Sequence, residues 1–128
     1  MKQYHKPHTK KVSSGTGGKR VKFRDKKLAH VGGVFTATKV ADKDERVVSR
    51  GRGFNLKTKL KRAAFVNVKN KEGKMSKAKI LGVLESHNPE YVRQNIITKG
   101  AVLNTEAGKV KVTNRVGQDG VVNGIVVG

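Results

Sequence analysis

The chain has 128 residues, of which 29 are Lys or Arg and nine are Asp or Glu, so its formal net charge is +20. Such a charge favours a polyanionic partner, and the length suits one domain. The absence of cysteine excludes a disulfide scaffold and thiolate metal sites. No apolar run is long enough to span a bilayer, and the N-terminus lacks the apolar segment of a secretory signal. We therefore expect neither a membrane-spanning nor a secreted protein.

The positive charge is concentrated toward the N-terminus. Residues 1–62 hold 19 basic and four acidic side chains, whereas residues 63–128 hold ten and five. A segment this basic and this poor in apolar residues buries too little surface to offset its chain entropy. We therefore predict a basic arm over residues 1–45, largely disordered without RNA, and a folded domain over residues 46–128. The predicted RNA-contacting residues of the arm are Lys10, Lys11, Lys19, Arg20, Lys22, Arg24, Lys26 and Lys27.

The remainder of the chain is typical of β-structure. Short valine-rich runs alternate with turn residues at a spacing of roughly 8–12 residues, the pattern of a small barrel or sandwich. Strands are predicted over residues 46–50, 55–68, 77–85, 96–98, 101–105, 109–113 and 121–127. Asn88, Pro89 and Glu90 predict one short helix, with Asn88 as its N-cap. The expected fold is all-β, a closed or partly open barrel of about six strands with one short helical turn.

The predicted strand over residues 55–68 alternates apolar and basic side chains. Lys57, Lys59 and Lys61 fall on one face, with Phe65 at its end. This pattern suits either a lysine stripe against a phosphate backbone or the solvated face of an edge strand, which lysine often protects from aggregation. Beside the basic arm and an Arg-rich turn, RNA contact is the preferred interpretation.

The string RGRGF over residues 50–54 places two arginines on a glycine turn. Glycines permit close approach of the backbone, and guanidinium groups bind phosphates or stack on bases; the alternative is a tight turn that is merely basic. The predicted RNA-contacting residues of the folded domain are Arg46, Arg50, Arg52, Lys57, Lys59, Lys61 and Arg62.

No arrangement in the sequence suggests catalysis. The acids are scattered, His5 and His8 stand in the arm without carboxylates nearby, and the glycine string before Lys19 lacks the Ser or Thr that a phosphate-binding loop requires. We therefore expect no enzyme, no metal, no cofactor and no small-molecule substrate. The few aromatic residues and the missing single-strand-binding motifs favour recognition of RNA shape and phosphates over the reading of bases.

A signature appears in the C-terminal half. The string NPEYVRQNIITKGAVLNTEAGKVKVTNRVGQDGVVNGIVV, over residues 88–127, closely resembles the S-eight-e family of small-subunit ribosomal proteins of archaea and eukaryotes. The similarity extends upstream through KAKILGVLESHNPEYV and GRGFNLKTKLKRAAFVNV and covers nearly the whole chain. Without a long insertion or C-terminal extension, the chain resembles the short archaeal form.

This resemblance implies a cytoplasmic structural protein of the small ribosomal subunit, monomeric when free. Its implied partners are small-subunit rRNA and neighbouring small-subunit ribosomal proteins. Carried over to this chain, residues 14–20 of the arm and the turn at residues 51–53 would face RNA. Two other functions remain open on the same residues: a ribosome-assembly factor, and a general nucleic-acid-binding protein outside the ribosome.

Overall fold

The computed structural model describes Tyr4 and residues 28–128. The chain divides into two compact units, Met1–Phe35 and Thr36–Gly128. In the first unit, Leu28–His30 forms a 3-10 turn, and Tyr4 forms an isolated antiparallel bridge with Val31. Most of the predicted arm lies outside the described residues, so its disorder in the free protein stays a prediction.

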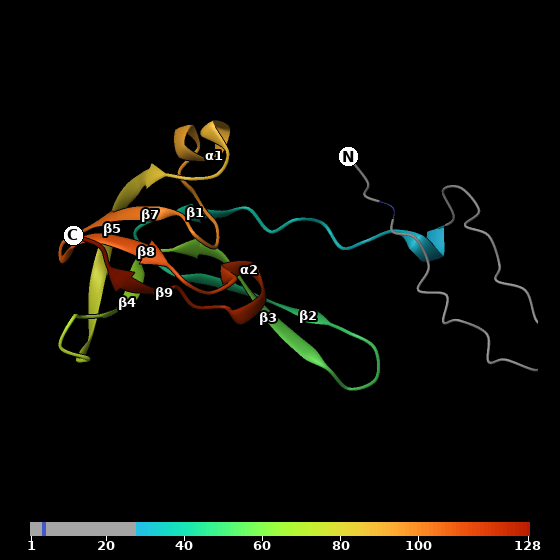
Figure 1. Cartoon of the computed structure of the whole chain (residues 1–128). Helices are drawn as coiled ribbons and strands as arrows, with labels where there is room; N and C mark the ends of the chain where they lie inside the picture. Colours follow the sequence, from blue (N-terminus) through green and yellow to red (C-terminus); the bar gives the residue numbers. More distant parts are fainter. Residues whose placement is uncertain (1–3, 5–27) are drawn as a thin grey trace, which may run out of the picture. The chain divides into compact units, whose positions relative to one another are not determined.

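The second unit contains a closed barrel of five strands (Figure 1). In spatial order these strands are β4 (Phe65–Lys69), β5 (Met75–Glu85), β7 (Val102–Thr105), β8 (Gly108–Val112) and β9 (Asn123–Val126). Neighbouring strands pair antiparallel except at the closure, where β4 and β9 are parallel. The predicted all-β fold with a small barrel is therefore confirmed.

A second sheet of four strands adjoins the barrel. Its spatial order is β2 (Glu45–Arg50), β3 (Leu56–Ala63), β1 (Thr38–Val40) and β6 (Ile96–Ile97). Strands β2 and β3 form an antiparallel hairpin, and β1 pairs parallel with the end of β3. Strand β1 was not predicted, and it lies within the segment that the sequence assigns to the arm.

The barrel encloses an aliphatic core. Alternation places Val66 and Val68 of β4, and Val110 and Val112 of β8, on the buried face of their strands. The other buried members of this cluster are Leu60, Ala63, Ala78, Ile80, Val83, Ile97, Ala101, Leu103, Val116 and Val122. Burial of this surface is the main source of the domain's stability.

The predicted single strand over residues 55–68 is in fact two strands. It bends at Ala64, and Ala63 and Ala64 are both buried, so the alternation changes phase there. Consequently β3 belongs to the four-stranded sheet and β4 to the barrel. The alternating pattern on either side of the bend gave no sign of this change of sheet.

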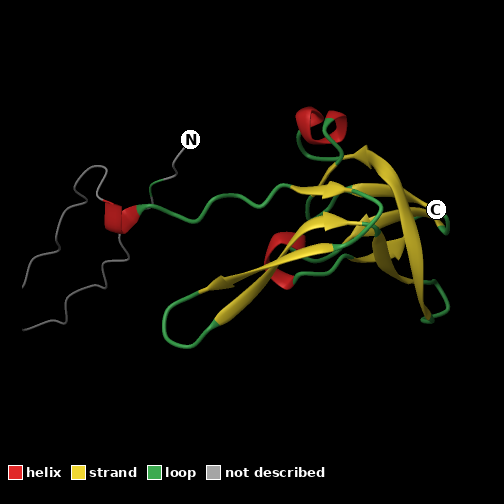
Figure 2. Ribbon diagram, turned by 180° about the vertical axis from the view of Figure 1, so that it is seen from behind, coloured by secondary structure: helices red, strands yellow, loops and turns green. Residues whose placement is uncertain are grey.

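Two short helices complete the second unit (Figure 2). The predicted helix is α1 (Pro89–Arg93), with Pro89 in its first turn and the Asn88 Oδ1 atom accepting a hydrogen bond of 3.0 Å from the Glu90 amide. A second helix, α2 (Val116–Asp119), was not predicted; it ends at left-handed Gly120. The end of helix α2 lies close against β3: a Cβ added at Gly120 would stand only 3.0 Å from the Thr58 Cγ2 atom.

Candidate nucleic-acid interface

The hairpin of β2 and β3 projects from the rest of the second unit (Figure 1). Its two strands pair from Glu45 opposite Arg62 to Arg50 opposite Leu56. The Gly51 amide closes the tip by donating to the Asn55 carbonyl at 2.7 Å, and Gly53 adopts a left-handed φ of 68° that favours glycine. We call residues 45–63 the hairpin and residues 51–55 its tip.

The hairpin carries cations and almost no acid. Beyond Glu45 at its base, residues 46–63 contain seven basic side chains and no acidic one. These are the seven residues predicted for the folded domain: Arg46, Arg50, Arg52, Lys57, Lys59, Lys61 and Arg62. The structure thus brings the second half of the predicted site together on one element.

Register divides the hairpin into two faces, because directly opposed residues of an antiparallel pair point to the same side. We call the side with Val47, Ser49, Lys57 and Lys59 the lysine face. The side with Arg46, Val48, Arg50, Leu56, Thr58 and Leu60 is the arginine face. At the base the arginine face is covered, and Leu60 is buried; toward the tip Val48 and Leu56 are exposed.

Arg46 is bound within the protein at the base of the hairpin. Its Nε atom donates to the Gly120 carbonyl at 2.8 Å, and its guanidinium pairs with Asp44 at 3.0 Å. The other carboxylate oxygen of Asp44 accepts from the amide of buried Ala64 at 2.7 Å. Arg46 and Asp44 therefore join the hairpin to α2 and to the start of the barrel.

Two further cations at the base share one acid. The Lys61 Nζ atom lies 3.3 Å from Glu45, and the Arg62 Nε atom lies 3.4 Å from the same carboxylate. The register shifts between Glu45 and Arg46, so Lys61 has no directly opposed partner on β2. The predicted stripe of three lysines is therefore a pair on the lysine face with Lys61 set apart at an irregularity.

Phe65 does not extend the lysine stripe. It begins β4 after the bend at Ala64, and the Lys77 Nζ atom lies 4.4 Å from the centre of its ring. It lines a small hollow together with Arg46 and Leu60 of the arginine face. The expectation of an aromatic at the end of the stripe is wrong, because the change of sheet turns Phe65 away from Lys57 and Lys59.

The cations nearest the tip are the most available. Lys57 donates from Nζ to the Gln118 Oε1 atom at 2.9 Å, a bond to a neutral exposed partner. The side chains of Arg50, Arg52 and Lys59 form no hydrogen bond or ion pair with any other residue that the structure describes. Guanidinium groups without internal partners retain all their donors for an external anion.

The barrel wall presents lysines that the sequence analysis did not select. Alternation directs five strand lysines outward: Lys69, Lys77, Lys79, Lys109 and Lys111. Lys69 and Lys111 both stand opposite Ile125 across neighbouring strands, so they flank it on the outer surface. The acids of this half lie in turns, in helices or at a strand end, so the modest net charge of residues 63–128 conceals a basic wall. The period-two spacing of these lysines was the signal that could have found it.

The remaining predicted residues lie in the part of the chain that the structure does not describe. These are Lys10, Lys11, Lys19, Arg20, Lys22, Arg24, Lys26 and Lys27. Over Tyr4 and residues 28–128, no three His, Asp or Glu side chains gather as metal ligands would. Nor is any helix there both long and apolar enough to cross a membrane.

A small barrel with basic walls and a protruding cationic hairpin defines a class of small, basic β-protein. The chain matches the model of the family described as "Ribosomal protein S8e" over residues 6–127, and it belongs to that family. The resemblance seen in the sequence is thereby confirmed.

Curated relatives cover most of the chain. It is 48% identical over 114 residues to "Small ribosomal subunit protein eS8" of Staphylothermus marinus, a match that spans 88% of this chain and 89% of the relative. The protein of that name from Sulfurisphaera tokodaii is 46% identical over 114 residues, with 88% and 89% covered. The one from Sulfolobus acidocaldarius is 42% identical over 129 residues, with 99% and 98% covered. The similar archaeal relatives thus have nearly the same length.

Proposed function

We propose that this protein is a structural constituent of the small ribosomal subunit that binds small-subunit rRNA. Membership of a ribosomal-protein family and the names of its archaeal relatives support the ribosomal role and a place in the cytoplasmic ribosome. Neighbouring small-subunit proteins are its other proposed partners. A structural role requires no catalysis, and none is proposed.

The observation that carries the rRNA-binding part of the proposal is the hairpin. Residues 46–63 hold seven cations and no acid, and the outer half of the hairpin is exposed on both faces. Phosphate contacts by Lys and Arg supply much of the affinity of proteins for nucleic acid, because each contact releases condensed counterions. A projecting two-stranded element (Figure 1) can place such contacts inside folded RNA at a distance from the barrel.

We assign the hairpin cations to two roles according to whether their side chains already have partners within the protein. Arg50, Arg52, Lys57 and Lys59 are assigned to phosphates directly, since they are unpaired among the described residues or bound only to a neutral amide. Arg46, Lys61 and Arg62 already pair within the protein, so they contribute chiefly to the long-range field. The arm cations between residues 10 and 27 are proposed to extend the contact along the RNA.

Salt titration of rRNA binding tests the proposal. Variant R50A/R52A/K59A removes three unpaired hairpin cations, and K74A/R93A/K99A removes three cations from exposed positions elsewhere on the unit. Each lost phosphate contact lowers the log–log slope of affinity against salt by about 0.7–0.9. We expect the hairpin variant to lose about two to three from the slope, and the matched control to lose much less. Equal losses in both variants, or a flat response for the unchanged protein, would refute the proposal.

Two further measurements separate this function from the alternatives left open by the sequence. Presence of the protein in mature small subunits after a high-salt wash supports a structural constituent, whereas restriction to precursor particles indicates an assembly factor. Equal affinity for duplex DNA and small-subunit rRNA at physiological salt would indicate a general nucleic-acid-binding protein.

A further inference from the structure

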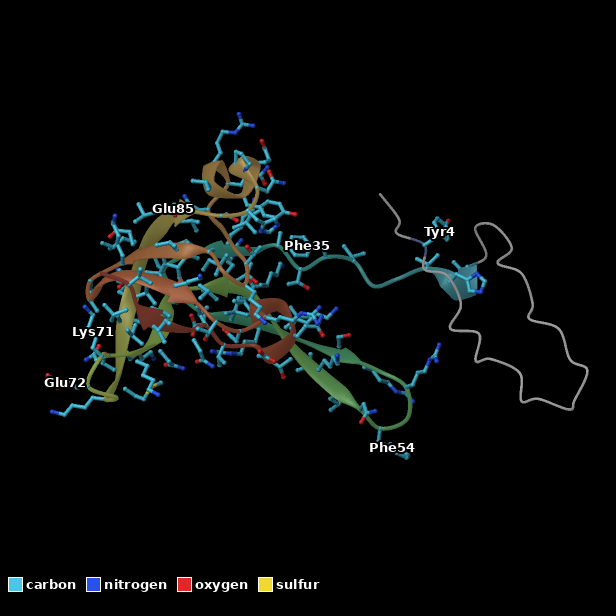
Figure 3. All side chains as sticks on the ribbon, in the orientation of Figure 1. Tyr4, Phe35, Phe54, Lys71, Glu72 and Glu85 are labelled. Carbon is cyan, nitrogen blue, oxygen red and sulfur yellow. The ribbon has the colours of Figure 1, made fainter. Side chains whose placement is uncertain are left out.

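The tip of the hairpin displays an aromatic ring in solvent. Phe54 has a relative exposure of 103%, the highest among the exposed large hydrophobic side chains of the described residues. Figure 3 shows its side chain at the tip, directed away from the ribbon. Nothing in the fold requires a ring here, because the turn is closed by the backbone bond between Gly51 and Asn55.

Phe54 is part of a mixed apolar and cationic surface. Leu56 and Val48, on the outer part of the arginine face, are 69% and 61% exposed. Arg50 stands opposite Leu56, and Arg52 lies two residues before Phe54 in the chain. Single exposed hydrophobic residues are common on protein surfaces, but a group of them on a projecting element indicates a contact surface.

The charge of this surface selects the chemistry of its partner. Among residues 46–63 no acid offsets the arginines and lysines around the ring. A partner with a negative backbone and planar apolar faces satisfies both components, and nucleic acid has both. In folded RNA the bases with free faces are those in loops, bulges and ends, where they can stack on aromatic side chains.

We propose that Phe54 stacks on an unpaired base of the bound RNA while Arg50 and Arg52 contact the flanking phosphates. This inference rests on the proposed rRNA binding and assigns the tip a second, uncharged component of affinity. Every base has a stacking face, so the contact tolerates different sequences. Stacking releases few counterions, so it contributes nearly equally at all salt concentrations, unlike the phosphate contacts.

Substitution of Phe54 in the full chain tests the inference by titration with small-subunit rRNA. Removal of one stacking ring lowers affinity by roughly 5- to 150-fold. We expect F54A and F54L to lose about tenfold at every salt concentration, with an unchanged salt slope, and F54W to bind as well as the unchanged protein. Equal thermal unfolding midpoints for all variants verify the fold, since the exposed ring contributes nothing to the core.

The chain has no tryptophan, so F54W also introduces a unique fluorophore at the tip. Stacking on a base should quench its emission on rRNA binding. F65W is the matched control, because Phe65 is 38% exposed and lies under Lys77 on the barrel. We expect strong quenching for F54W and little change for F65W.

The outcomes distinguish this inference from the function on which it rests. Absence of rRNA binding by the unchanged protein would overturn both. Salt-dependent binding with wild-type affinity in F54A would overturn only the stacking contact. Full affinity in F54L would overturn it by showing a generic apolar contact, and unquenched F54W would overturn it by showing that the ring does not stack on a base. If F54A binds free rRNA normally but dissociates from intact small subunits, Phe54 contacts a neighbouring protein and the inference is wrong.

Discussion

The barrel and the hairpin both have alternating sequences, but the alternation has different consequences in the two regions. In the barrel strands one side of the alternation is a closed core, as with Val66 and Val68 of β4. In the outer half of the hairpin neither side is closed, and Val47, Val48 and Leu56 are all exposed. Core packing therefore constrains the sequence of the barrel strands. It does not constrain the hairpin residues that lie between Leu60 and the tip. The proposed RNA contact accounts for the hairpin's arginines, its lysines and Phe54.

Acidic residues distinguish the two regions further. In the barrel half of the chain, five outward lysines are accompanied by acids in turns, in helices and at a strand end. In the hairpin beyond Glu45, every charged side chain is basic. The electrostatic potentials of neighbouring charges of one sign add in the surrounding solvent. The hairpin should therefore produce the more concentrated positive potential. The net charge of residues 63–128 does not reveal this difference, because it sums the lysines of the barrel wall with the acids in the turns, in the helices and at the strand end.

A matched pair of leucine truncations should show the largest contrast in stability. Leu103 is fully buried in β7, and Leu56 is 69% exposed near the hairpin tip. We expect L103A to lower the free energy of unfolding by about 3 kcal/mol, through lost burial and the cavity left behind. L56A should change it by less than about 0.5 kcal/mol. Urea unfolding followed by circular dichroism measures both, and similar losses would contradict the division into a closed barrel and an open hairpin.

The next contrast adds one methyl group in each region. A Cβ at Gly124 would lie 2.4 Å from the Val110 Cγ1 atom and 2.8 Å from the Lys111 carbonyl oxygen, so β8 and β9 would have to separate. A Cβ at Gly51 meets only ordinary contacts, of 3.4 Å and longer. We expect G124A to lower the free energy of unfolding by about 2 kcal/mol. G51A should be close to neutral, because alanine also restricts the unfolded chain.

Sequence patterns predicted those parts of the fold in which local chemistry and packing agree. The valine-rich alternation located the barrel strands, and Asn88 and Pro89 located α1, because cap and proline preferences act within one turn. The bend at Ala64 and strand β1 were missed. Both depend on pairings between distant segments, such as Lys39 beside Arg62, that no local pattern contains.

The candidate site was predicted in its composition and not in its internal bonds. The basic residues of the hairpin were selected from their alternation, the Arg-rich glycine turn and the basic arm before them, and the structure gathers them on one element. That Arg46 binds the Gly120 carbonyl could not be foreseen, because the two residues are 74 positions apart. The importance of Phe54 was also missed, since an isolated aromatic in a turn gives no sign of its exposure.

The junction between the two regions should respond to the loss of a single acceptor. The Asp44 carboxylate receives the amide of buried Ala64 at 2.7 Å, and D44A would leave that amide without a partner. We expect a loss of about 1.5 kcal/mol in the free energy of unfolding. D44N retains a side-chain oxygen able to accept the same bond, so it should recover most of that loss. If both variants lose the same amount, the ion pair with Arg46 and not the Ala64 bond holds the junction.

The smallest expected effect concerns one cation on the barrel wall. The Lys77 Nζ atom lies 4.4 Å from the centre of the Phe65 ring, whereas Lys79 stands opposite Phe65 in register without a cation–π contact to it in the structure described. K77A and K79A remove the same charge from the same exposed face of β5, so their long-range electrostatic effects nearly cancel in the comparison. K77A should cost about 0.5 kcal/mol more than K79A, the energy of an exposed cation–π contact. A double-mutant cycle with F65L isolates this term, since the extra cost of K77A should vanish once the ring is absent. If it persists, Lys77 acts through its aliphatic chain and not through its charge.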